Sequence, residues 1–366
     1  MGVEAVSKIK CRLISSSNAP HLQQLYAGFL ILHRNGIIDL EQQISKQEHL
    51  TRPAEYHLRD AWRVHLSVVV DDKLKLHYDT HDSWEIDEEQ LANSDFYFKR
   101  TFKPGIAEKL GAEGRKLRPL GLNYAVLPNG PDGRALRRSI CLSVGRQRII
   151  DIIRSLSLPD PLIFAPRLRK MWSLPEFDAP PKALFVTGAW DPHDNPQRPP
   201  ESVREIHGIS EARAECLRLL RKELGDRFFG GFARSPYALK HYGDLVIPDC
   251  SLGTQGNYLK LMKQYPICVT TVGLHGSVGW KLAEYVAFGK AIVTEKLNCV
   301  VPGDFSKDAN YLEFSTPQEC VEKVKLLLAD AGLRRQMMAN NAAYYHSFLR
   351  PDRLILNSIM TALTAC

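Results

Sequence analysis

The stretch at 273–295 reads GLHGSVGWKLAEYVAFGKAIVTE and carries side chains that could bind a diphosphate and hydroxyl groups. Lys281 and Glu284 are three residues apart and Ser277 precedes Lys281 by four, so on a helix the three would share one face. A small-residue loop that leads into a helix offers free backbone N–H groups and the positive end of the helix dipole, and both favour an anion. Lys281 adds a full charge, and Glu284 adds an acceptor for hydroxyls. The segment therefore predicts a site for a diphosphate that carries a sugar or a ribose.

The same residues have a simpler interpretation. Lys281 and Glu284 could form an exposed pair on a helix, which would stabilise it by only ~0.3–0.5 kcal/mol. Gly289 would end the helix in either case. For the pair alone, the exposed interpretation is the ordinary one. The whole string of residues in register favours the binding site.

A second group of chemically active side chains follows a β-rich run at 74–78. Asp79, His81 and Asp82 come directly after it, and the carboxyl ends of strands are where open α/β sheets bind ligands. A carboxylate or imidazole there could deprotonate an acceptor hydroxyl as a general base. The alternative is a turn in which the Asp side chains accept backbone N–H groups. The sequence leaves both interpretations open.

Further polar residues follow other predicted strands. Ser16 lies in the polar loop after a strand at 8–14, His21 lies on the helix predicted next, and Lys99 with Arg100 ends another short run. The serine and the histidine are candidate acceptor contacts, and a negatively charged acceptor could use the two cations. The alternatives without a ligand are a loop that caps the following helix and cations that lie in solvent.

These residues need alternating strands and helices to position them. From 182 onward, apolar strand-like runs alternate with helical patterns, which predicts a doubly wound parallel sheet. The runs lie at 182–188, 227–232, 267–271 and 291–293. The first half repeats the order of strand, polar loop and helix less regularly, and the basic amphipathic stretch at 137–156 predicts another helix.

The segment at 273–295 resembles the nucleotide-binding core of GT-B glycosyltransferases, in the group-1 (retaining, glycosyltransferase family 4-like or spore-protein-like) branch. The family pattern is a Gly, then a Glu, a small residue, a second Gly and a hydrophobic strand. It is matched here by Gly279, Glu284, Ala287, Gly289 and residues 291–293. The resemblance implies that Glu284 holds the ribose hydroxyls and that Lys281 meets the diphosphate. It covers about half of the chain, from 182 to the end.

Two positions depart from the family pattern. Most group-1 enzymes carry a second Glu eight residues earlier, where this chain has Gly276, and many carry an Arg where this chain has Ala189. The resemblance implies retention of anomeric configuration; inversion with Asp82 or His81 as the base is the alternative. The candidate donor-binding residues are Glu284, Lys281, Gly279, Trp280, Ser277, His275, Gly188, Arg234 and Arg198.

A proline-rich stretch separates the two predicted units. We expect an N-terminal acceptor-binding domain over 1–160, a linker over 161–181, a C-terminal nucleotide-sugar-binding domain over 182–346 and a tail helix over 347–366. The predicted fold class is α/β with two Rossmann-like domains. The GT-B resemblance implies a deep cleft between them and a tail that crosses back to the N-terminal domain.

Composition places the chain among soluble globular proteins, with 44% hydrophobic and 24% charged residues. No run approaches the ~20 apolar residues of a membrane span, and a formal charge of +7 is too dispersed to predict nucleic-acid binding. The eight cysteines include no close pair, which argues against a zinc site and a disulfide framework. We expect a cytoplasmic protein.

The sequence and the resemblance together predict a glycosyltransferase that moves a sugar from a nucleotide-sugar donor to a small-molecule or glycan acceptor. The resemblance implies no metal and no cofactor, with Lys281 and helix N-termini offsetting the charge of the leaving diphosphate. Two other functions stay open. A nucleotide-sugar epimerase of the same fold would need no acceptor, and a non-catalytic nucleotide-sugar-binding protein would turn over neither bond. The nucleotide, the sugar, the acceptor and the oligomeric state have no signature in the sequence.

Overall fold

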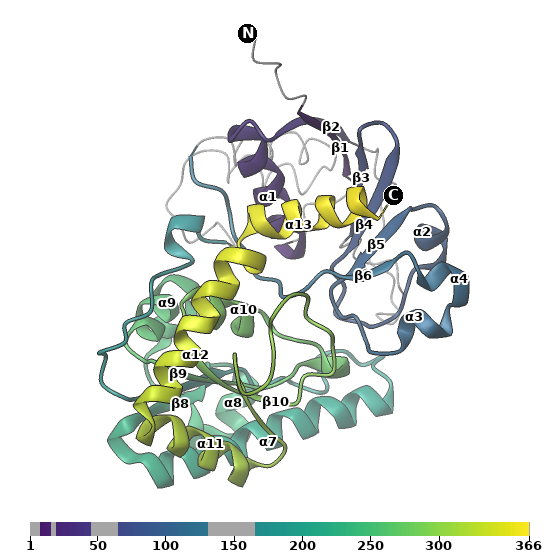
Figure 1. The fold of residues 1–366 in the computed structure, drawn as a ribbon. Helices are drawn as coiled ribbons and strands as arrows, with labels where there is room; N and C mark the ends of the chain where they lie inside the picture. The colour runs from purple at the N-terminus through teal and green to yellow at the C-terminus, as the bar shows by residue number, and fades with distance from the viewer. Residues whose placement is uncertain (1–7, 16–19, 45–64, 131–164, 366) are drawn as a thin grey trace.

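The described residues form two α/β units, each built on one sheet (Figure 1). The computed structural model describes residues 8–15, 20–44, 65–130 and 165–365. The N-terminal sheet has the strand order β2-β1-β3-β4-β5-β6, and the C-terminal sheet has the order β11-β10-β9-β7-β8. The predicted α/β class is thereby confirmed. The helix predicted at 137–156 and the candidate Ser16 lie outside the described residues.

The N-terminal sheet is mixed. Its strands are β1 Ile9–Ser15, β2 Ile38–Ile44, β3 His65–Val70, β4 Leu74–Asp79, β5 Phe96–Lys99 and β6 Leu117–Pro119. Strand β3 runs antiparallel to both β1 and β4, and the other pairs are parallel. The β3–β4 reversal is tight because Asp71 and Asp72 adopt left-handed backbone angles, with φ of 50° and 54°.

Short helices connect these strands, and one longer helix covers the sheet. They are η1 Pro20–Leu22, α1 Gln23–Arg34, α2 Glu88–Ala92, α3 Ile106–Lys109 and α4 Gly111–Gly114. The last helix of the chain, α13 Pro351–Thr364, returns to pack against α1 (Figure 1). The two helices approach so closely that a Cβ at Gly28 would lie 2.3 Å from the carbonyl oxygen of Pro351. The tail helix predicted from the resemblance is therefore present.

The C-terminal unit is a doubly wound parallel sheet. Its strands are β7 Ala183–Thr187, β8 Phe228–Phe232, β9 Ile267–Thr270, β10 Ala291–Glu295 and β11 Leu312–Phe314. Val246 adds a single parallel bridge beside Phe232 at the outer edge of β8. Counted within this unit, the order from that edge is 3-2-1-4-5-6, as in dinucleotide-binding folds. The order reverses between β7 and β9, where such sheets bind ligands.

Helices cover both faces of this second sheet. They are α7 Pro200–Leu224, α8 Pro236–His241, α9 Gln255–Lys263, α10 Trp280–Ala287, α11 Pro317–Ala329 and α12 Ala331–Tyr344. Among the described helices, none combines the length and apolar character that a membrane span needs.

A shared hydrophobic cluster joins the two units. Ala27 and Tyr124 of the N-terminal unit pack in it with Tyr285 and Tyr345 of the C-terminal unit. Met171, within the predicted linker, is fully buried in the same cluster. The domain boundaries predicted from the sequence stay predictions.

Candidate functional site

The loop before α10 differs from its predicted form. The helix begins at Trp280, so the prediction that Ser277 shares a helix face with Lys281 and Glu284 is wrong. The helical path is broken before it because His275 and Gly276 adopt φ of 59° and 67°. Ser277 is buried in the loop, and its carbonyl oxygen accepts a hydrogen bond from the Gly273 N–H at 2.8 Å. The predicted turn at Gly289, with φ of 56°, then leads into β10.

Glu284 is buried and Lys281 is half-buried, so the two are not an exposed pair. Glu284 is 5% exposed, and its Oε1 accepts a hydrogen bond from Gln255 Nε2 at 3.1 Å. The Lys281 Nζ lies 3.6 Å from the centroid of the Tyr258 ring. Burial lowers the pKa of Lys281 to about 8, with the charge of Glu284 opposing this shift, and burial raises the pKa of Glu284. A half-buried cation and a buried carboxyl group one turn apart, both with shifted pKa values, make this pair a candidate for ligand binding.

A buried arginine, missed in the sequence, ties together the strand ends beside α10. Arg213 of α7 donates from Nη1 to the Gly188 carbonyl at 2.9 Å and from Nε to Thr271 Oγ1 at 2.8 Å. Burial lowers its pKa to about 10. Its spacing from the buried Ser210 and Leu217 places it on the inward face of the helix, which is a signal that the sequence contained.

A cavity of about 410 Å³ opens where β7 and β8 end. Trp190, Tyr237 and Arg198 line it, but neither Lys281 nor Glu284 does. The charge of Arg198 is committed to its own loop, because its Nη1 pairs with Asp194 at 2.6 Å and also donates to neighbouring carbonyl oxygens. Of the predicted donor-binding residues, only Arg198 lines the cavity, and Arg234 is exposed outside it.

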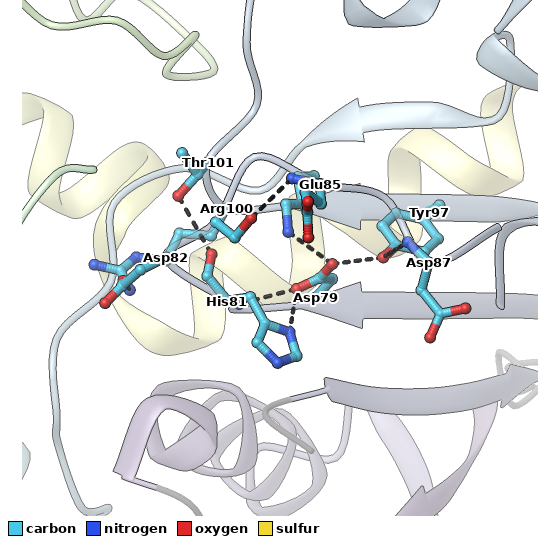
Figure 2. A network of polar contacts seen from close by, with 10 residues as sticks. Asp79, His81, Asp82, Glu85, Asp87, Tyr97, Arg100 and Thr101 are labelled. Carbon is cyan, nitrogen blue, oxygen red and sulfur yellow. Dashed lines mark hydrogen bonds and ion pairs between the residues drawn. The ribbon is translucent and has the colours of Figure 1, made fainter. Parts of the chain in front are cut away.

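A network of polar contacts follows β4 in the N-terminal unit (Figure 2). Asp79 is 3% exposed and accepts hydrogen bonds on both oxygens. Its Oδ1 takes the His81 backbone N–H at 2.9 Å and lies 3.0 Å from His81 Nδ1. Its Oδ2 takes the Lys99 ammonium at 2.8 Å and the Tyr97 hydroxyl at 2.5 Å. The carboxylate thus fixes the His81 ring with Nδ1 directed at itself.

Charge balance keeps Asp79 ionised. Burial alone would raise the pKa of Asp79, but the charge of Lys99 and the bonds from His81 hold it well below its usual range. Lys99 is fully buried with its charge used on this carboxylate, so it does not present a cation to an acceptor. Asp82, whose side chain is half-exposed, is instead ion-paired with the Arg100 guanidinium (Figure 2).

The N-terminal unit meets the start of α10 at an interface that we call the seam. Its residues are His21, Arg100 and Phe102 on the N-terminal side and Val278, Trp280 and Val300 on the C-terminal side. The His21 ring lies edge-on to Trp280 at 5.0 Å between centroids. Burial and the charge of Arg100 lower the pKa of His21 to about 4, so its ring is neutral at physiological pH. Its Nδ1 is buried and has no hydrogen-bond partner among the described residues.

The structure therefore brings some candidates together and leaves others apart. His21, His81, Asp82 and Arg100 lie close enough to affect one another electrostatically, and Trp280 faces them across the seam. His275 is exposed, and its backbone N–H donates to Glu205. Within the described residues, no three His, Cys, Asp or Glu side chains are grouped as metal ligands.

Residues 217–351 match the family described as glycosyl transferase-like. Among solved structures, the chain is similar to HepE from Anabaena in complex with UDP and glucose, with 12% identity over 96% of this chain and 98% of that chain and a TM-score of 0.37. It is similar to TarM from S. aureus, with 11% identity over 73% of this chain, 50% of that chain and a TM-score of 0.36.

A third similar structure is the UDP-GlcNAc 2-epimerase from Neisseria meningitidis bound to UDP-GlcNAc, with 13% identity over 91% of this chain and 72% of that chain and a TM-score of 0.34. The chain spans about half the length of TarM. No curated protein sequence matches the chain.

Proposed function

We propose that the chain transfers a sugar from a nucleoside diphosphate sugar to an acceptor hydroxyl, because residues 217–351 match a glycosyl transferase-like family and the described residues form two α/β units. One observation carries this proposal. Glu284 is buried and Lys281 is half-buried one turn before it, on the helix whose first residue, Trp280, meets His21 of the opposite unit. Helix α10 also follows β9, at the point where the order of the sheet reverses.

The donor side would act by electrostatic stabilisation. The backbone N–H groups at the start of α10 and the Lys281 ammonium would offset the charge that develops on the leaving diphosphate. Glu284 would accept hydrogen bonds from the ribose hydroxyls while Gln255 keeps its carboxylate oriented. No metal enters this proposal, because the half-buried Lys281 can supply the positive charge.

On the acceptor side, His81 is better suited than Asp82 to act as the general base. Asp79 accepts from Nδ1 of His81 and so leaves Nε2 as the proton acceptor. Asp82 is engaged by Arg100. Nε2 would take the proton of the acceptor hydroxyl as that oxygen bonds to the anomeric carbon. The carbon–oxygen bond to the diphosphate would break at the same time, and the diphosphate would leave with the electron pair.

The first test is a thermal-stability screen against UDP, GDP, TDP, ADP and CDP and their sugars, because a ligand that binds the folded state stabilises it. We expect one nucleotide to raise the melting temperature. Glu284→Ala should remove most of that rise, and Glu322→Ala, an exposed glutamate on α11, should leave it intact. Equal stabilisation in parent and Glu284→Ala would refute the role of Glu284.

Product analysis separates the remaining alternatives. Transfer by His81 as a base inverts the anomeric configuration, whereas retention, implied by the family resemblance, would require another route and would exclude this role for His81. A nucleotide-sugar that changes without any acceptor would mean an epimerase. Binding without turnover of either bond would mean a non-catalytic protein.

A further inference from the structure

Three consecutive residues after β5, Arg100 to Phe102, connect the loop that bears His81 to the C-terminal unit. The Arg100 N–H donates to the Asp79 carbonyl at 2.9 Å, and Thr101 Oγ1 donates to the His81 carbonyl at 3.3 Å. Phe102 reaches the other unit, because its carbonyl accepts the Val300 N–H at 2.8 Å. The segment therefore holds the backbone on both sides of the seam.

The Arg100 side chain makes the same connection. Its Nη1 pairs with Asp82, and its Nη2 donates to the Val278 carbonyl at 2.5 Å (Figure 2 shows the pair with Asp82). Val278 lies two residues before the first residue of α10. Arg100 is only 5% exposed, so this is not a solvated surface contact.

The planar guanidinium suits this position. Its N–H groups diverge in a fixed geometry, so one side chain can hold a carboxylate and a carbonyl at the same time, which an ammonium on a flexible stem does poorly. The two groups that it joins lie on the acceptor side and on the donor side of the proposed reaction. Asp82 follows His81 directly in the chain, and Val278 leads into the helix that carries Lys281 and Glu284.

We propose that Arg100 is a positioning residue that fixes the His81 loop relative to the start of α10 and so sets the distance between the base and the anomeric carbon of the donor. The inference rests on the proposed function. It assigns Arg100 to alignment and not to an anionic acceptor. Misplacement of reacting groups by about 1 Å can cost ~10²-fold in rate, so a residue that sets this distance affects turnover strongly.

The test compares Arg100→Ala and Arg100→Lys with Arg118→Gln, whose wild-type arginine on β6 bonds to carbonyls of its own unit. Affinity for the most stabilising nucleoside diphosphate is measured by calorimetry, and kcat of transfer is measured with the matching nucleotide-sugar. We expect kcat to fall ~10²-fold in Arg100→Ala and less in Arg100→Lys, with nucleotide affinity unchanged in both. Added guanidinium should restore part of the turnover of Arg100→Ala only.

The outcomes separate this inference from the proposed function. If nucleotide affinity falls by the same factor as kcat, Arg100 binds the donor and the inference is wrong. An unchanged kcat in Arg100→Lys and Arg100→Ala would also overturn it. A parent protein that neither binds a nucleotide nor transfers a sugar would remove both proposals. If Arg100→Ala melts early, Arg100→Lys, which keeps the buried charge, still decides the question.

Discussion

Lys281 is half-buried against the Tyr258 ring. Because burial lowers its pKa, its charge is sensitive to pH near neutrality. Its pKa of about 8 means that the ammonium is present below that pH and is lost as the pH rises through it. We therefore expect kcat/KM for the donor to fall above about pH 8. This ratio is the quantity to measure, because its pH dependence reports the pKa values of groups in the free enzyme.

Lys281→Arg is the matched control for this pH dependence. A guanidinium keeps its charge to a far higher pH, so the alkaline limb should move upward or disappear in a pH profile of kcat/KM. The same limb in parent and variant would mean that another group titrates there.

Asp79 contributes stability because it neutralises a lysine that has no access to water. Asp79→Asn would leave Lys99 buried without its anion, and breaking such a pair typically costs ~3–5 kcal/mol. Urea unfolding at pH 7 should show this loss, and Asp226→Asn, at an exposed position, should unfold like the parent. Because the pKa of Asp79 is depressed in the folded state, its contribution is present above pH ~4 and lost as the pH falls below it.

At the scale of residues, the sequence located chemical groups but not their partners. Asp79, His81 and Asp82 were recognisable because they follow a β-rich run. His81 contacts Asp79 within one turn, but the contacts of Lys99 with Asp79 and of Arg100 with Asp82 depend on how β4 and β5 lie side by side. Arg100 could be recognised only as a cation at a strand end, because its contact to Val278 spans 178 residues of chain.

Among elements, α1 and α13 approach closely at Gly28. A Cβ there would lie 2.5 Å from Ile355 Cγ1 as well as against the Pro351 carbonyl. Gly28→Ala should therefore lower stability by ~1–3 kcal/mol, because the two helices must separate. Gly208→Ala should raise stability by ~0.5–1 kcal/mol, since it lies in α7 with nothing within 4 Å of the added Cβ.

Melting temperatures of the two alanine variants measure this difference directly. The chemical change is the same and both sites lie within a helix, so opposite signs isolate the packing of α1 on α13. A stabilised Gly28→Ala would show that the contact relaxes at little cost.

Local signals were strong for elements in the C-terminal unit. Thr316 caps α11, with its Oγ1 accepting the Glu319 N–H at 3.2 Å and Pro317 in the first turn, as is typical of a Thr-Pro helix start. Strand β2 was missed because its sequence, IDLEQQI, has polar side chains at most positions and lies at the edge of its sheet. The start of helix α7 at Pro200 is hard to locate from the sequence, because the first turns of the helix are polar and show little apolar periodicity.

For the whole molecule, the shared cluster predicts one cooperative unfolding transition. Two-domain chains often unfold in steps when their interface is small and polar. Here Ala27, Tyr124 and Tyr285 belong to one apolar core. Helix α13 follows the C-terminal unit in the chain and packs on the N-terminal unit. Differential scanning calorimetry should give a single peak whose calorimetric and van't Hoff enthalpies agree. Two resolved peaks would mean that the units unfold independently.

The return of α13 to α1 also bears on the order of events at the ribosome. Ile355 and Ile359 complete the apolar core that Phe29 and Leu13 begin, yet they are synthesised more than three hundred residues later. The N-terminal unit therefore emerges with one side of its core open, and it cannot close that core until the opposite unit has been translated. We therefore expect chaperones to bind a newly made N-terminal half, because the apolar side chains that α13 later covers are still exposed.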